Sequence, residues 1–411
     1  TGKTSTVVGK VGHLLKTQWC EPNEILVLSF SSSTVVELNE RLAQVSADGV
    51  VVKTIHALGL DIIRKCTDVE PGVMDLHRIR NIVTDCLKNL RDDDAENKKL
   101  FEYLGYYYYP ENYDTDFKSA KESNQFATGY NLRSLPHPVG ELNKVTLKRE
   151  KVRSVQEVKL ANWLYLNGVN YKYEARYRDC DQNVGVSRYY PDFYLPDYHI
   201  YIEHFGIQRD NSTRPDIDST KYLAGMDWKR NIHREGGTTL VETFSYEFRE
   251  GNVFKNLKKK LREHGVELQP ISADEIKHAV DEPLKGLAKL VGTFLAHYKE
   301  DPDETERKIA DISEEENPRE YRFIQIFRKV LRHYEARQTE EQQVDFGDMM
   351  FEASKFVESG EYTNPFRAII VDEYQDISRA RARLIDSLQT SYPDTRLLCV
   401  GDDWQSIFRF S

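Results

Sequence analysis

The chain has 411 residues, of which 39% are hydrophobic and 30% are charged, so it can bury a sizeable core and form two or three domains. Lys and Arg number 57 against 67 Asp and Glu, and the net charge of −10 excludes a uniformly basic nucleic-acid coat. Any contact with DNA must therefore use a local groove. No apolar run approaches the roughly 18 residues of a membrane span, and the sequence predicts no membrane partner.

The five cysteines lie far apart and form no CxxC pair. This spacing argues against a disulfide framework or a zinc ribbon and fits a reducing compartment. We therefore expect a cytoplasmic protein.

Strands and helices alternate at both ends of the chain. In the first 65 residues the hydrophobic pattern predicts strands at 25–30 and 50–55 and helices at 4–15, 34–44 and 58–65. The last 50 residues repeat the pattern, with a helix at 378–389 between strands at 368–372 and 396–400. Continuous apolar strands are typical of a parallel sheet buried on both faces, so both ends are expected to form one α/β domain.

The middle of the chain has a different pattern. Residues 72–151 and 248–340 are polar and helical, whereas residues 152–247 form a compact α/β pattern of their own. That pattern predicts helices at 155–167 and 221–235 and strands near 171–177, 189–195, 199–205 and 239–243. We expect an α/β domain of residues 1–71 and 341–411, interrupted by a helical subdomain that is itself interrupted by a small α/β domain at 152–247.

The chain opens with Thr1-Gly2-Lys3-Thr4, directly before a predicted helix. In a phosphate-binding loop, backbone amides and the helix N-terminus hold phosphates, the Lys reaches the β- and γ-phosphates, and the Thr hydroxyl binds Mg²⁺. Only the end of that motif is present, so an ordinary helix start is the alternative interpretation.

Two apolar strands near the C-terminus end in acidic residues. The first runs into Asp372-Glu373-Tyr-Gln-Asp376, where a strand-end Asp can hold Mg²⁺ and the next Glu can deprotonate an attacking water. The second runs into Gly401-Asp-Asp-Trp-Gln405, followed by Phe408 and Phe410. A Gln beside a γ-phosphate can report the nucleotide state. Aromatic rings can stack on unpaired bases, although each ring alone is better explained by a core position.

Taken in order, these motifs resemble those of superfamily 1 DNA helicases of the UvrD/Rep type. The resemblance covers about 1–66 and 344–411 and includes the segments 26–30, 54–59 and 345–349. It implies a P-loop, RecA-like parallel sheet with a helical subdomain. It also implies that the protein uses ATP and Mg²⁺ and moves 3′→5′ on single-stranded or partly duplex DNA.

The resemblance assigns roles to individual residues. Thr1, Gly2, Lys3 and Thr4 would bind nucleotide, and Thr4 and Asp372 would hold the metal. Glu373 would be the general base and Gln405 the sensor of the γ-phosphate. The single-strand track would be lined by Ser29, Phe30, Thr54, His56, Phe408 and Phe410.

The sequence departs from the family pattern at three places. Ser31-Ser-Ser33 stands where Thr-Asn-Lys is usual, Phe408 where a Tyr is usual, and Ser411 where an Arg is usual. The second RecA-like half, which supplies an arginine to the ATP site, is not part of this sequence. We therefore expect a fragment that forms only part of the ATP site by itself.

The segment 152–247 carries two acids on successive predicted strands. Asp192 follows Pro191, and Glu203 lies about 11 residues further on. Two such acids can share a Mg²⁺ or Mn²⁺ ion that activates water against a phosphodiester.

This pattern resembles the PD-(D/E)xK nuclease core, which implies a restriction-endonuclease-like fold with Glu157 approaching from a helix. Phe205 stands where that core has a Lys, and Lys229 on the following helix is a candidate substitute. An active nuclease, a nuclease-like fold retained only for docking DNA, and an unrelated α/β insert all remain open.

Three functional hypotheses follow. The first is an ATP-dependent DNA helicase or translocase in DNA repair, recombination or defence. The second is a metal-dependent nuclease that the ATPase moves or gates. The third is a catalytically idle module that docks DNA or a partner.

Overall fold

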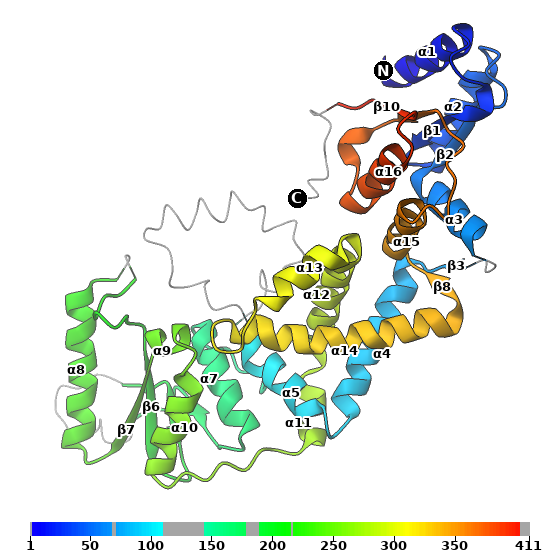
Figure 1. The fold of residues 1–411 in the computed structure, drawn as a ribbon. Helices are drawn as coiled ribbons and strands as arrows, with labels where there is room; N and C mark the ends of the chain where they lie inside the picture. The colour runs from blue at the N-terminus through cyan, green and yellow to red at the C-terminus, as the bar shows by residue number, and fades with distance from the viewer. Residues whose placement is uncertain (1, 68–70, 110–143, 178–188, 215–216, 403–411) are drawn as a thin grey trace. The chain divides into compact units, whose positions relative to one another are not determined.

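The computed structural model describes residues 2–67, 71–109, 144–177, 189–214 and 217–402 (Figure 1). The chain forms two compact units. Unit 1 comprises Thr1–Ile79, Gly292–Ala310 and Arg332–Ser411, and unit 2 comprises Arg80–Val291 and Asp311–Leu331. Three helices contribute residues to both units: α4 (Leu76–Asp92), α12 (Asp281–Glu300) and α14 (Pro318–Glu341).

Unit 1 is built on a four-stranded sheet with the order β10-β9-β1-β2, in which every neighbouring pair is parallel. The strands are β1 (Ile25–Ser29), β2 (Val51–Thr54), β9 (Ala368–Val371) and β10 (Arg396–Cys399). Each lies within a predicted strand. The predicted α/β class with a parallel sheet is therefore confirmed.

Helices cover both faces of this sheet (Figure 1). Ile25 and Val27 of β1 pack in one core with α1 (Gly2–Lys16) and α2 (Ser32–Ala43). Leu26 and Leu28 point the other way, because successive strand residues alternate between faces. They pack in a second core with α3 (Ile55–Cys66), α15 (Phe346–Glu358) and α16 (Arg379–Ser391). Burial on both faces explains why these strands are continuously apolar.

A buried polar cluster fixes the start of α15. Asp345 caps the helix by accepting a hydrogen bond from the Asp348 backbone N–H at 2.8 Å, and it also accepts one from the Tyr334 hydroxyl at 2.7 Å. Lys299 forms an ion pair with Asp348 at 2.7 Å. Unit 1 also contains α13 (Pro302–Ala310), the parallel pair β3 (Gly72–Val73) and β8 (Gln343–Val344), and the short 3-10 turns η1 (Pro22–Glu24) and η5 (Tyr374–Asp376).

Unit 2 contains a second four-stranded sheet with the order β4-β5-β6-β7. The strands are β4 (Lys172–Tyr173), β5 (Phe193–Leu195), β6 (Ile200–Phe205) and β7 (Thr239–Phe244). The first three are antiparallel neighbours, and β6 and β7 are parallel. The strands β4 and β5 are shorter than predicted. Pro191 has no N–H for a ladder hydrogen bond, and β5 begins only after it.

Helices surround this second sheet and continue beyond it. They are α5 (Asn97–Glu102), the π-helical turn η2 (Tyr103–Tyr107), α7 (Val155–Leu166), α8 (Ser219–Glu235), α9 (Ser245–Arg249), α10 (Val253–Glu263) and α11 (Ala273–Ala279). Tyr103, Tyr106, Tyr108 and Tyr109 are all buried, so these four tyrosines pack in the interior of this unit. Among the described residues, no helix is both long enough and apolar enough to cross a bilayer.

Candidate functional site

The carboxyl ends of three parallel strands meet at one edge of the unit 1 sheet. Asp372 follows β9, and its backbone N–H donates to the Leu28 carbonyl of β1 at 2.9 Å. Tyr374 donates to the Val400 carbonyl, which follows β10, at 3.0 Å. In open α/β sheets this edge is where ligands bind, because the loops that leave the strands diverge there.

Lys3 reaches this edge from the first turn of α1. Its ammonium forms an ion pair with the Glu373 carboxylate, which lies 370 positions further along the chain. That hydrogen bond raises the pKa of Lys3 above its ordinary value. Gly2 and Thr4 occupy the same helical turn, with Thr4 half-buried. A carboxylate and a phosphate offer an ammonium the same kind of oxygen acceptor, so Lys3 lies where it can bind an anion.

Asp372 and Glu373 occupy different environments although they are adjacent. Asp372 is 2% exposed, and burial raises its pKa despite the hydrogen bond that it accepts from the Glu373 N–H at 3.0 Å. Burial also acts to raise the pKa of Glu373, but hydrogen bonds from Gln375 and Lys3 outweigh it and lower the pKa overall. Glu373 is therefore an ionised carboxylate that can accept a proton.

The backbone of Glu373 is held in an uncommon conformation. Its φ of +56° and ψ of +39° place it in the left-handed region, which side chains other than Gly adopt at a cost. The turn that follows β9 directs its side chain toward Lys3. Such conformations are concentrated at functional sites, where the surrounding structure maintains them.

Gln375 joins the two acidic segments. Its amide nitrogen donates to Glu373 Oε2 at 2.7 Å, and its amide oxygen accepts from the Asp402 backbone N–H at 2.9 Å. Gly401 lies so close that a Cβ there would be 2.8 Å from the Gln375 oxygen. Sequence reasoning did not assign Gln375 a role, because only its place in the acidic segment was visible.

The oxygen donors of Thr4 and Asp372 fit Mg²⁺ by their chemistry. Thr4 would supply a hydroxyl and Asp372 a carboxylate, which are the hard oxygen ligands that Mg²⁺ prefers. Burial disfavours the ionised form of Asp372 and so raises its pKa, and a bound cation would offset this cost of ionisation.

Four residues expected to line a DNA track, Ser29, Phe30, Thr54 and His56, lie at or just after the ends of β1 and β2. Thr54 caps α3 by accepting a hydrogen bond from the Ala57 N–H at 3.1 Å, and His56 lies in the first turn of that helix. Phe30 directly follows β1. Ser29 is only 1% exposed, and its hydroxyl has no hydrogen-bond partner among the described residues. The structure therefore encloses the Ser29 side chain.

Arg381 of α16 brings Phe30 and His56 together. Its guanidinium lies 4.7 Å from the Phe30 ring centroid, and its Nη2 is 3.4 Å from His56 Nε2. Burial, and then the Arg381 charge, lower the pKa of His56 to about 4, so the imidazole is neutral at neutral pH. Phe346 packs on His56 with ring centroids 4.5 Å apart and is 42% exposed.

Arg381 and Phe346 were both missed by sequence reasoning. The available signal was the run Arg379-Ala-Arg381-Ala-Arg383 at the start of a helix. Arg379 and Arg383 pair with carboxylates, whereas Arg381 has no ion pair among the described residues. The structure thus leaves Arg381 beside two of the expected DNA-contact residues.

In unit 2, the strand register places Asp192 and Glu203 opposite each other. Phe193 pairs with Ile202 in the antiparallel β5–β6 ladder, and continuing that register pairs residue 192 with 203. Side chains opposite each other in such a pair lie on the same face of the sheet. The His204 N–H also donates to Asp192 Oδ2 at 2.6 Å.

Lys229 and Tyr189 complete this cluster. Lys229, on α8, forms an ion pair with Glu203, whose other oxygen accepts from the Tyr189 hydroxyl at 2.8 Å. Glu203 is fully buried, and burial raises its pKa against the opposing effect of Lys229. Burial, the Glu203 charge and the Glu157 charge together raise the pKa of Asp192 well above its ordinary value.

Glu157 lies in the first turn of α7, where it accepts hydrogen bonds from the Ser154 and Tyr173 hydroxyls at 2.9 and 2.6 Å. Three of the expected residues, Asp192, Glu203 and Lys229, therefore converge, and Glu157 lies close enough to influence Asp192. Among the described residues, no group of three or more His, Cys, Asp or Glu side chains could hold a metal ion.

Comparison with known proteins agrees with the geometry of unit 1. The family model of the UvrD/REP helicase N-terminal domain matches residues 1–411. This chain belongs to the UvrD/REP helicase family. The family resemblance of the sequence motifs is thereby confirmed.

Three curated proteins illustrate the relationship of this UvrD/REP-family chain. It is 37% identical over 103 residues to DNA helicase IV of Escherichia coli, 30% identical over 160 residues to the putative ATP-dependent DNA helicase YjcD of Bacillus subtilis, and 32% identical over 69 residues to the ATP-dependent DNA helicase Rep of Escherichia coli. These matches cover 25%, 38% and 16% of this chain. They span only 15%, 18% and 10% of the relatives' own lengths.

Several residues implied by the UvrD/Rep resemblance cannot be placed. Thr1, Gln405, Phe408, Phe410 and Ser411 lie outside the described residues. Their expected roles in nucleotide binding, γ-phosphate sensing and DNA stacking stay predictions.

Proposed function

We propose that the protein is an ATP-dependent DNA helicase or translocase that moves 3′→5′. The observation that carries this proposal is the convergence of Lys3, Asp372 and Glu373 at the carboxyl edge of the parallel sheet. Family membership and the names of the relatives support the same activity.

The proposed chemistry follows from the environments of these residues. Lys3 would exchange its Glu373 partner for the β- and γ-phosphate oxygens of ATP. Thr4 and Asp372 would hold Mg²⁺, which supplies neutralisation of the phosphate charge. Released from Lys3 but still held by Gln375, Glu373 would orient the attacking water and take its proton.

DNA is the proposed partner. Phe30, Thr54 and His56, together with Phe408 and Phe410, would line the path of a single strand, with Arg381 beside Phe30 and His56. Single-stranded or partly duplex DNA would be the substrate, in DNA repair, recombination or defence. We also propose a cytoplasmic location, since Cys20, Cys66, Cys86 and Cys399 are all free thiols.

Two variants test the motor proposal. In a protein that carries the complete ATP site, Glu373→Gln should lower DNA-stimulated ATP hydrolysis by roughly 10²–10⁴-fold, since it removes the base, while binding of a fluorescent ATP analogue stays within about twofold. Lys3→Ala should weaken nucleotide binding itself. Glu361→Gln, an exposed Glu-to-Gln change elsewhere in unit 1, is the matched control. Equal loss of binding and hydrolysis in Glu373→Gln would instead assign that residue a structural role.

We propose a metal-dependent DNA nuclease in residues 152–247 as the second candidate function. It is favoured by the convergence of Asp192, Glu203 and Lys229, in which Lys229 provides the cation that Phe205 cannot. Mg²⁺ often takes only one or two protein carboxylates and keeps several waters, so the absence of a three-ligand group among the described residues is compatible with this proposal. The raised pKa of both acids would fall once a cation bound between them.

Plasmid cleavage with Mn²⁺ or Mg²⁺ and no ATP tests the second candidate. We expect cleavage that Asp192→Asn and Lys229→Ala each abolish, and that Glu373→Gln leaves unchanged. Lys221→Ala, an exposed Lys on the same helix, is the control. No cleavage by the unaltered protein, with DNA binding intact, would leave the docking module as the function of this segment.

A further inference from the structure

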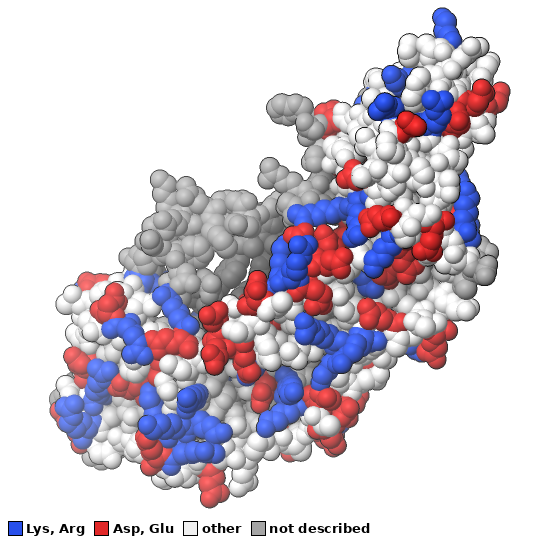
Figure 2. Space-filling model, viewed as in Figure 1, with Lys and Arg blue, Asp and Glu red and all other residues white. Residues whose placement is uncertain are grey.

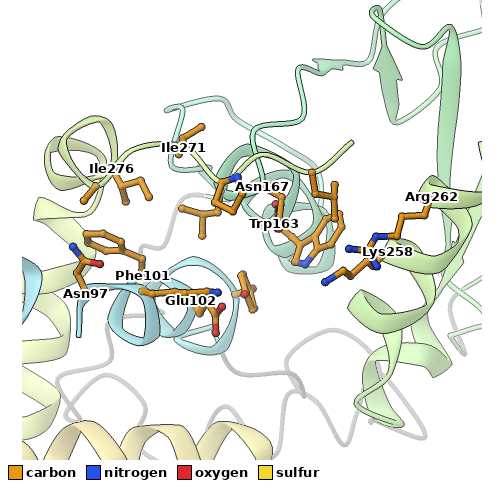
Figure 3. Close-up of a pocket in the computed structure, with 15 residues that line it drawn as sticks. Asn97, Phe101, Glu102, Trp163, Asn167, Lys258, Arg262, Ile271 and Ile276 are labelled. Carbon is orange, nitrogen blue, oxygen red and sulfur yellow. Dashed lines mark hydrogen bonds between the residues drawn. The ribbon is translucent and has the colours of Figure 1, made fainter. Parts of the chain in front are cut away.

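A cavity of about 400 Å³ opens in unit 2 among α5, α7, α10 and α11 (Figure 3). Its volume is within the range of small-ligand sites. None of the residues discussed above for the motor or for the nuclease-like cluster lines it. It is therefore separate from both candidate sites.

One side of the cavity is aromatic and aliphatic. Phe101 of α5 and Trp163 of α7 are 3% and 4% exposed, and Ile276 of α11 adds an aliphatic surface. The Trp163 ring stacks on Phe254 with centroids 6.2 Å apart and an interplanar angle of 12°, so its orientation is fixed. Only a small part of each buried ring reaches the cavity, so the rings and Ile276 form a rigid apolar wall that a flat heterocyclic ring can contact.

The side formed by α10 is cationic, and the carboxylate of Glu102 on α5 is the acidic group of the lining. In Figure 3, Lys258 and Arg262 extend from α10 toward the Trp163 side of the cavity. Both are exposed, and neither has a carboxylate within ion-pair distance among the described residues. Lys260, on the same helix, does bond with Glu247. Lys258 and Arg262 are thus available for an anionic ligand.

The basic surface continues along α10. Val253, Leu257 and Leu261 bury the opposite face of the helix, so Lys255 lies in line with Lys258. Figure 2 shows Lys and Arg gathered over this helix. In a chain with a net charge of −10, such a concentration is the local basic surface that a polyanion requires.

We propose that this cavity binds an unpaired base of single-stranded DNA while the α10 cations hold the adjoining phosphates. Lys258 and Arg262 belong both to the cavity and to the basic face, so a phosphate on them places its base at the aromatic wall. The amides of Asn97 and Asn167 line the same cavity and offer hydrogen bonds to base edges. The choice of DNA as the polymer rests on the proposed function.

Photocrosslinking locates the site. Oligo-dT carrying 5-iodouracil should crosslink to the peptides that contain Phe101 or Trp163, and an excess of free dTMP should not prevent this. Crosslinks confined to unit 1 would overturn the inference while leaving the motor proposal intact. Complete protection by dTMP at micromolar concentration would show a site for free nucleotides instead.

Two variants separate charge from shape. Lys258→Glu should weaken oligo-dT binding roughly tenfold and reduce the salt slope by about 1. The control Lys221→Glu reverses the charge of an exposed Lys on α8, outside the cavity lining and the basic face of α10, and should change little. Ala273→Trp fills the cavity without changing its charge. This variant should therefore bind oligo-dT only as tightly as the unaltered protein binds an abasic strand. Thermal unfolding verifies that each variant is folded.

Equal effects of the two charge reversals, or normal binding by Ala273→Trp, would refute the proposed site. DNA-stimulated ATP hydrolysis, measured on the same variants, separates this failure from a failure of the proposed function. If the unaltered protein bound no single-stranded DNA at all, both proposals would be wrong.

Discussion

Removal of the Gln375 side chain tests how the general base is positioned. In Gln375→Ala, Glu373 loses the hydrogen bond of 2.7 Å from the amide nitrogen, and the Asp402 N–H loses its acceptor at 2.9 Å. A hydrogen bond to a charged group contributes about 1.5–3 kcal/mol. The Glu373 side chain is 35% exposed, so water can replace part of that bond, and the lower value applies. At about 1.4 kcal/mol per factor of ten, kcat for ATP hydrolysis should fall about tenfold.

The pH profile distinguishes positioning from a general structural effect. Hydrogen bonds from Gln375 and Lys3 hold the pKa of Glu373 below its ordinary value, so losing one of them raises that pKa. The acidic limb of kcat should therefore move to higher pH in Gln375→Ala, while the KM for ATP changes little. Gln375→Glu should not rescue activity, because a second carboxylate repels the base.

Steady-state ATPase assays with single-stranded DNA, at several pH values and on a protein that carries the complete ATP site, measure both effects. Gln389→Ala removes an exposed Gln from α16 and serves as the matched control. Activity within twofold of the unaltered protein, with an unmoved acidic limb, would refute the positioning role. A raised KM with unchanged kcat would instead assign Gln375 to nucleotide binding.

Gly401→Ala should reduce kcat about as much as Gln375→Ala in the same ATPase assay, because the new Cβ would lie 2.8 Å from the Gln375 oxygen and displace that side chain. The double variant should show little further loss of kcat. Burial, and then the charge of Asp345, raise the pKa of Asp348 to about 6 from its ordinary 3.8, so folding favours the protonated form and stability is lost as pH rises from about 4 to 6. The free energy of unfolding of Asp348→Asn, measured with urea and compared with that of the unaltered chain, should therefore rise by at most about 3 kcal/mol between about pH 4 and 6. Gly168→Ala combines a φ of +68° with a Cβ 1.9 Å from a backbone oxygen, and should lower the free energy of unfolding by about 2–4 kcal/mol in thermal denaturation. Gly237→Ala, with a φ of +63° and open space around the Cβ, should cost only about 1 kcal/mol.

Local patterns in the sequence determined the parallel sheet and part of the candidate sites. The apolar runs at 25–30 and 368–372 can be satisfied only by strands covered on both faces, and this is where β1 and β9 form. Because parallel strands align their carboxyl ends, the acids after β9 had to lie near the residues that follow β1. The spacing of Asp192 and Glu203 similarly made their pairing a consequence of the hairpin register.

Side-chain partners across long sequence separations were decided only by the tertiary structure. The ion pair of Lys3 with Glu373 depends on how α1 packs beside the sheet, and the contact of Arg381 with Phe30 depends on how α16 packs. The left-handed backbone of Glu373 and the enclosure of the Ser29 hydroxyl have no local sequence signal. Hydrophobic periodicity specifies which face of an element is buried, but burial energy is non-directional. Which polar atoms meet is set by the packing angles and distances that many distant residues fix together.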